Sequence, residues 1–171
     1  LILGPNINVP MDPTAEPTAR DFVLKAVALK ARATPRERDW IDALAVRYTG
    51  KADDRAAADH AYADAMGRLS AKYPNDLDAA TMYAEAIMDL RPWNYWTRDG
   101  RPYDGVEQAV STIRSVLKRD PDHIGALHYW IHLMEATPTP WRAEEEADRL
   151  QPLAPAAGHL VHMPGHIYIR I

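Results

Sequence analysis

Residues 121–134, PDHIGALHYWIHLM, and residues 155–168, PAAGHLVHMPGHIY, are the two stretches that decide the fold. Each begins with a proline and contains two histidines spaced four residues apart, which is one turn of an α-helix. Each histidine of the first pair has a counterpart 34 residues later: His128 with His162, and His132 with His166. A period of this length is typical of arrays in which every repeat is a pair of helices. The spacing therefore predicts an all-α protein in which four imidazoles project from equivalent positions of two stacked helices.

The rest of the chain after residue 13 also has a helical pattern, without the alternation that is typical of strands. Thr34, Pro35 and Glu37 form a helix start signal, in which a hydroxyl caps, a proline takes the first helical position and a carboxylate reaches back. The unit after Pro74 is 13 residues longer than the period. The excess matches residues 91–103, RPWNYWTRDGRPY, which are predicted to form a loop between two helices.

On these spacings the chain resembles the tetratricopeptide repeat (TPR) proteins over nearly everything after residue 34. It resembles more narrowly a bacterial group of such proteins in three strings: MYAEAIMDLRPWNYWTRDGRP at 82–102, HYWIHLMEATP at 128–138 and AGHLVHMPGHIYIR at 157–170. The resemblance implies a right-handed α-solenoid of TPR-like helix pairs, whose first helices line a concave groove. We therefore expect an extended N-terminal arm at residues 1–13 and a repeat domain at residues 14–171, in which the last repeat is incomplete.

Histidines and carboxylates on the predicted groove surface are candidate metal ligands. Removing the 13-residue insertion places Glu85 opposite His132 in the preceding repeat. Neutral imidazole and carboxylate are the usual nitrogen and oxygen ligands of transition metals, and the chain has no cysteine to supply a thiolate. Copper or zinc is favoured because the set is rich in histidine, and iron is an alternative. The candidate metal ligands are His128, His132, His159, His162, His166, Glu85 and Glu135.

Aromatic and basic residues beside the histidines are candidates for lining or covering the groove. They are Trp93, Tyr95, Trp96, Tyr168 and Arg170. The three aromatic residues of the insertion either cover a ligand or pack on the end of the preceding helix, and packing is favoured. Pro164 interrupts the last helical pattern. It either kinks one helix or begins a new one.

Composition limits the classes of partner. The net charge of −4, with acidic and basic residues interspersed, argues against nucleic-acid binding, and no apolar run is long enough to cross a membrane. Both ends are apolar, which predicts end-to-end association either with copies of the chain or with the remainder of a longer chain. The compartment is open, and the periplasm or the extracellular space is favoured over the cytoplasm.

The leading functional hypothesis is a TPR-type binding or scaffold protein that holds a transition metal in its groove and assembles into filaments. One alternative is a copper- or iron-dependent oxidoreductase built on the same solenoid. The other is a metal-free domain that binds an acidic peptide.

Overall fold

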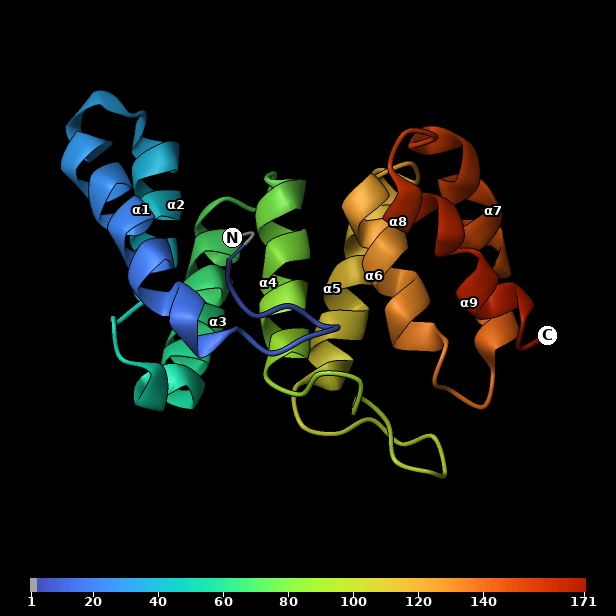
Figure 1. Cartoon of the computed structure of the whole chain (residues 1–171). Helices are drawn as coiled ribbons and strands as arrows, with labels where there is room; N and C mark the ends of the chain where they lie inside the picture. The colour runs from blue at the N-terminus through green and yellow to red at the C-terminus, as the bar shows by residue number, and fades with distance from the viewer. Residues whose placement is uncertain (1–2) are drawn as a thin grey trace. The chain divides into compact units, whose positions relative to one another are not determined.

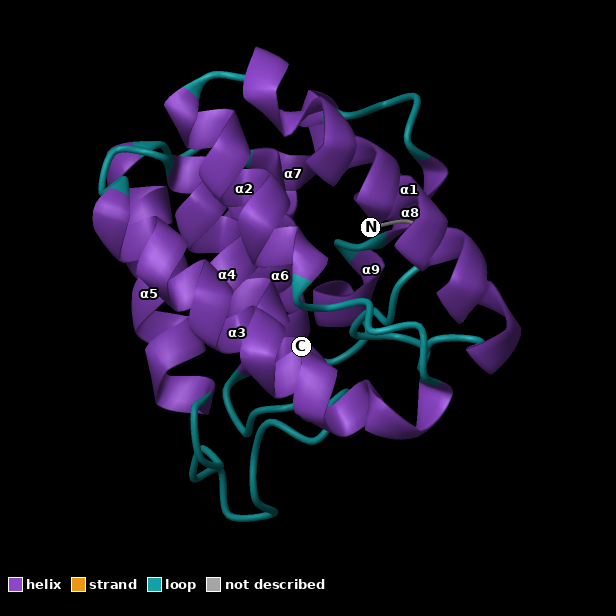
Figure 2. Cartoon of the chain, turned by 90° about the vertical axis from the view of Figure 1, so that its left-hand side faces the viewer, coloured by secondary structure: helices purple, strands orange, loops and turns teal. Residues whose placement is uncertain are grey.

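Helices are the only regular secondary structure in the part of the chain that the structure describes, residues 3–171 of a computed structural model (Figures 1 and 2). No strand occurs among these residues, so the predicted all-α class is confirmed. The chain divides into two compact units, residues 1–92 and residues 93–171. Each unit is described below by itself.

The N-terminal unit contains four helices that pack on one another in chain order: α1 (Glu16–Leu29), α2 (Pro35–Ala45), α3 (Arg55–Lys72) and α4 (Leu77–Asp89). The predicted start of α2 is confirmed, because the Thr34 hydroxyl accepts from the Glu37 amide and the Glu37 carboxylate accepts from the Thr34 amide. Before α1, Met11 is buried against Val23 and Tyr48, so this part of the N-terminal segment packs on its own unit.

The C-terminal unit is built on α5 (Val106–Arg119), α6 (Ile124–Met134) and α7 (Glu144–Leu153). Helix α6 packs against both α5 and α7, and its apolar stripe is buried as the sequence predicted. The buried residues of that stripe are Leu127, Trp130, Ile131 and Met134. Because α6 is packed on two sides, its backbone is held in place, and so are the positions of the side chains that it contributes to the site described below.

The predicted loop at residues 91–103 is confirmed as irregular backbone between α4 and α5. Tyr95 is buried, and the Trp96 indole N–H donates to the carbonyl of Leu133 at 2.6 Å, so these two rings anchor the loop. Trp93 is the one non-glycine residue of the described chain with a left-handed backbone, at a φ of 62°. Such strain persists only where the surroundings hold it in place.

Pro164 separates two short helices, α8 (Gly158–His162) and α9 (Gly165–Tyr168). Pro164 lies at the N-cap of α9, and its carbonyl accepts from the amides of Ile167 and Tyr168. Of the two alternatives for this proline, the structure therefore shows a new helix. Helix α9 packs against α6 and α7, so the last helix of the chain belongs to the packed C-terminal unit.

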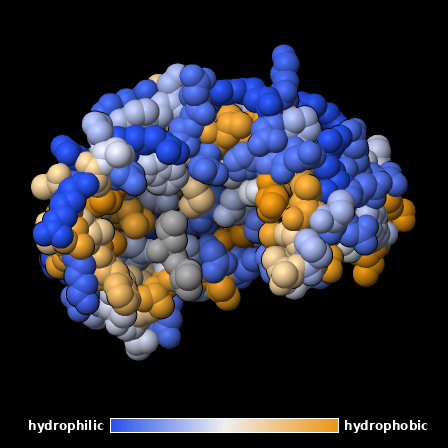
Figure 3. Space-filling view, turned by 90° about the horizontal axis from the view of Figure 1, so that it is seen from above, coloured by the Kyte–Doolittle hydropathy of each residue, from blue (hydrophilic) through white to orange (hydrophobic). Residues whose placement is uncertain are grey.

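Several apolar side chains of α1 lie at the surface. Phe22, Leu24 and Leu29 are each at least half exposed. Figure 3 shows hydrophobic residues at the surface on its left-hand side, over the N-terminal unit. Phe22, together with Val23 and Tyr48, also helps to line an apolar pocket of about 710 Å³. None of the described helices is both long and apolar enough to span a membrane.

Candidate functional site

Five histidines converge in the C-terminal unit, from three helices. Helix α6 contributes His128 and His132, α8 contributes His159 and His162, and α9 contributes His166. Their rings form a continuous set, because neighbouring ring centroids lie between 4.8 and 6.2 Å apart. We call this set the histidine cluster. The predicted convergence of the two histidine pairs on one surface is present in the structure.

Glu135 is the buried carboxylate that organises the histidine cluster. It follows α6 directly, and its two oxygens contact two different rings: Oε1 lies 2.9 Å from Nδ1 of His132, and Oε2 lies 2.9 Å from Nδ1 of His166. Burial alone would raise the pKa of Glu135, but the hydrogen bonds with His132 and His166 outweigh it and lower that pKa. The carboxylate is therefore ionised at neutral pH and acts only as an acceptor.

An ionised carboxylate fixes the tautomer of both rings. Because Glu135 can only accept, Nδ1 of His132 and Nδ1 of His166 must each carry a proton and donate it. A neutral imidazole that donates from Nδ1 holds its lone pair on Nε2. The two Nε2 atoms are thus prepared as acceptors or as metal ligands, which is the usual role of a carboxylate behind a metal-binding histidine.

Nε2 of His132 is buried and has no hydrogen-bond partner among the described residues. His132 itself is only 2% exposed. A buried acceptor without a partner loses about 1–3 kcal/mol relative to the same acceptor in water. This atom is the least satisfied point of the histidine cluster.

The Nε2 atoms of His128 and His159 lie 3.0 Å apart. One ligand atom from each of these three histidines lies within 4.8 Å of the other two. Burial, and then the neighbouring histidines, lower the pKa of His128 to about 3, and the same causes lower the pKa of His159. Both rings are therefore neutral at neutral pH, and in the hydrogen bond between them one Nε2 carries the proton while the other accepts it.

His162 and His166 form a second close pair, in which the two Nε2 atoms also lie 3.0 Å apart. Since the lone pair of His166 is on Nε2, the proton of this hydrogen bond belongs to Nε2 of His162, which donates it. In a regular helix, two histidines at positions i and i+4 project from the same side. His162 and His166 keep this arrangement although Pro164, between them, begins a new helix.

Two other predicted residues lie at the edge of the cluster. The Trp93 ring meets the His132 ring edge to face, with centroids 5.6 Å apart, so the strained loop places an aromatic ring against the central histidine. The Arg170 guanidinium lies 3.8 Å from Oε2 of Glu135 and is half exposed. By contrast, the Tyr168 hydroxyl donates to Asp148 on α7, and burial followed by this hydrogen bond raises the pKa of Tyr168 to about 12.

The prediction that Glu85 joins the histidines stays a prediction. Glu85 lies on α4 in the N-terminal unit, buried beside Asp89 and Arg47. The predicted register also paired His128 with His162, whereas the direct partner of His128 is His159, one turn earlier. The Pro164 break accounts for this difference, since α8 and α9 do not continue as one regular helix.

A second group of buried charges lies in the N-terminal unit and was not predicted. Arg47 is 1% exposed; it donates to the Asp89 carboxylate and, at 3.2 Å, to the carbonyl of Pro5. Burial, and then the repulsion of neighbouring carboxylates, raise the pKa of Glu85 well above its usual range, and burial raises the pKa of Asp89 to about 6. These carboxylates form no group that could hold a metal ion, since both such groups of the described chain belong to the histidine cluster.

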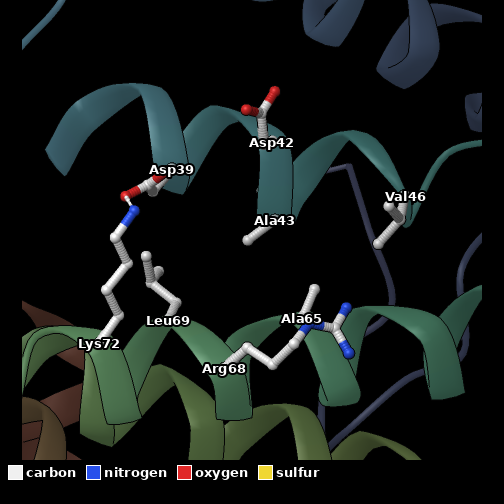
Figure 4. Close-up of a pocket in the computed structure, with 8 residues that line it drawn as sticks. All are labelled: Asp39, Asp42, Ala43, Val46, Ala65, Arg68, Leu69 and Lys72. Atoms are coloured by element: carbon white, nitrogen blue, oxygen red, sulfur yellow. Dashed lines mark hydrogen bonds and ion pairs between the residues drawn. The ribbon is translucent and has the colours of Figure 1, made fainter. Parts of the chain in front are cut away.

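The pocket between α2 and α3 has its polar groups largely paired. In Figure 4 it is lined by apolar residues such as Ala43 and Leu69, with Asp39 ion-paired to Lys72 at one end. The neighbouring Asp42 pairs with Lys30 at 2.6 Å. The histidine cluster, which combines an unpaired buried nitrogen with several neutral imidazoles, is therefore the stronger candidate for a functional site.

Comparison of the chain with models of protein families, with curated proteins and with solved structures finds no match in any of the three.

Proposed function

We propose that the C-terminal unit binds a transition-metal ion through Nε2 of His128, His132 and His159. The single observation that carries the proposal is the buried, unpartnered Nε2 of His132, whose lone pair Glu135 fixes in place. A metal ion between the three nitrogens gives this lone pair a partner. The ring that donates Nε2–H in the hydrogen bond between His128 and His159 must release that proton, to solvent or to its own Nδ1, so that both Nε2 atoms can form coordinate bonds.

The spacing of the His128 and His159 nitrogens suits coordination with little movement of these two rings. Two nitrogen ligands at about 2.0–2.1 Å from a tetrahedral metal lie about 3.3–3.4 Å apart. The Nε2 atoms of His128 and His159 lie 3.0 Å apart, so they need to separate by only a few tenths of an ångström. All three rings come from the same unit, and Glu135 holds the central one.

An alternative set of ligands uses Glu135 itself with His132 and His166, whose ligand atoms also lie within 4.8 Å of one another. Two histidines and one carboxylate are the ligand set of many iron(II) oxygenases. This set would take Nδ1 of His132 and leave its buried Nε2 without a partner. The set of three histidines is therefore favoured, and with it zinc or copper over iron.

A metalloenzyme is the second candidate, and one feature of the site favours it. Structural zinc sites have four protein ligands, whereas catalytic sites have three and leave a position for water or substrate. The proposed site has three protein ligands, and the third, His159, is exposed. A metal there would have an open position facing solvent, where it could act as a Lewis acid or exchange electrons.

The repeat architecture is proposed as the scaffold for this site. Within the N-terminal unit each helix packs on the next one along the chain, and α5, α6 and α7 do the same in the C-terminal unit, which is the contact pattern of helical repeat arrays. A TPR-like solenoid accounts for this order. The exposed apolar residues of α1 and the exposed Ile169 are then candidate contacts for association with other copies.

Metal loading of protein purified without a histidine tag tests the proposal. We expect dialysed protein to bind zinc or copper, and the substitution His159→Ala to weaken binding by about tenfold or more. His159 is exposed, so the substitution leaves the core intact. His60→Ala, at an exposed position on α3, is the matched control and should bind as the unchanged protein does. Protein that binds neither metal would refute the proposal.

A further inference from the structure

His162 and His166 remain unused by the metal site proposed above. Their Nε2 atoms lie 3.0 Å apart, as close as those of His128 and His159. His162 is exposed, and His166 is held from behind by Glu135 in the same way as His132. The cluster therefore contains two close pairs of nitrogens. One Glu135 oxygen contacts His132, beside the first pair, and the other contacts His166, in the second pair.

One ion cannot take up all five rings in this arrangement. The ligand atoms that lie within 4.8 Å of one another around the first position come from His128, His132 and His159. His166 belongs instead to a separate group with His132 and Glu135. Since ligands of one tetrahedral ion lie about 3.4 Å apart, His162 and His166 could join the first ion only if the rings moved.

We infer that the histidine cluster is a two-metal centre, in which a second transition-metal ion binds between Nε2 of His162 and Nε2 of His166. This inference rests on the proposed metal site, which supplies the first ion. Coordination at the second position requires that His162 release the Nε2 proton that it now donates to His166. The proton passes to solvent or to Nδ1 of the same exposed ring, so both rings present lone pairs to the ion.

Glu135 connects the two positions. Its carboxylate stands behind His132 of the first position and His166 of the second, so one negative charge supports both ions. The second ion has two protein ligands rather than three, and it is repelled by the first. Its affinity should therefore be lower, and its remaining positions should be filled by water.

A zinc titration of the full chain, with a chromophoric chelator as competitor, tests the inference by its stoichiometry. We expect two equivalents for the unchanged protein and one equivalent for the double substitution His162→Ala and His166→Ala. The pair lies toward the surface on short helices, so the core of the unit is retained. His60→Ala should retain both equivalents.

The same proteins loaded with copper(II) give an independent reading by electron paramagnetic resonance. Two neighbouring copper ions broaden each other's signal by dipolar coupling, and we expect the double substitution to leave the signal of an isolated ion. One equivalent of zinc in the unchanged protein, or two equivalents in the double substitution, would overturn the two-metal centre while leaving the first site intact. Zero equivalents would instead overturn the proposed function itself.

Discussion

Glu135 now holds His132 and His166 in the same tautomer, with the proton on Nδ1. Replacing Glu135 by glutamine should force one of these two rings into the other tautomer. Glutamine keeps the size of the side chain but offers one acceptor oxygen and one donor nitrogen. It can accept from Nδ1 of either His132 or His166, but not from both. The ring that faces the amide N–H must move its proton to Nε2, which is the atom proposed to bind metal.

The size of the effect follows from the change at the ring that faces the amide N–H. Substitution of a group that orients a metal ligand typically lowers metal affinity by about 10–100-fold, which is about 1.4–2.7 kcal/mol. Glu135→Gln reverses the direction of one of the two 2.9 Å hydrogen bonds and removes a full negative charge, so we expect a loss within this range. The fold should persist, because the glutamine still fills the buried position.

The assay is a zinc competition titration at neutral pH of Glu135→Gln beside Glu107→Gln. Glu107 is an exposed residue on α5, and its substitution removes the same charge without changing a residue of the histidine cluster. We expect a weakened zinc affinity for Glu135→Gln alone. Equal affinities for the two variants would refute the idea that Glu135 prepares the rings for metal.

Three further predictions concern other parts of the chain. Arg47→Met should lower the free energy of unfolding by about 3–5 kcal/mol in urea titrations, since it leaves the buried Asp89 carboxylate unpaired; a loss below about 1 kcal/mol would contradict this. The raised pKa of Glu85 means that the folded chain keeps a proton that the unfolded chain loses as pH rises. Glu85→Gln should therefore gain stability relative to the unchanged protein by up to about 1.4 kcal/mol per pH unit, between pH ~4.5 and the raised pKa of Glu85 in the folded chain; a difference independent of pH would count against it. Copper(II) should quench Trp93 fluorescence because its ring contacts His132, and Trp93→Phe should remove that part of the quenching; unchanged quenching would place the metal elsewhere.

Much of the fold could be predicted from the sequence, because its signals are local. The cap at Thr34 and the loop at residues 91–103 depend on residues a few positions apart, and both are confirmed. The apolar stripe of α6 is likewise a matter of helical period. Convergence of the histidines could be anticipated for a different reason, because their 34-residue spacing is the length of one two-helix repeat.

The finer pairing could not be predicted. The register assumed two equal helices, but Pro164 divides the second one, and the division turns His159 rather than His162 toward His128. The ion pair of Arg47 and Asp89 joins residues 42 positions apart, and nothing in either local sequence distinguishes these charges from surface charges. Long-range polar pairs depend on tertiary packing, which residue spacing does not determine.

The most direct measurement is anomalous diffraction at the zinc absorption edge from crystals of the zinc-loaded, tag-free protein. We expect an anomalous peak about 2.0–2.1 Å from Nε2 of each of His128, His132 and His159, with Glu135 still bound to Nδ1 of His132. A zinc ion bound by Glu135 and the Nδ1 atoms, or zinc-loaded crystals without a peak among the histidines, would contradict the proposed site.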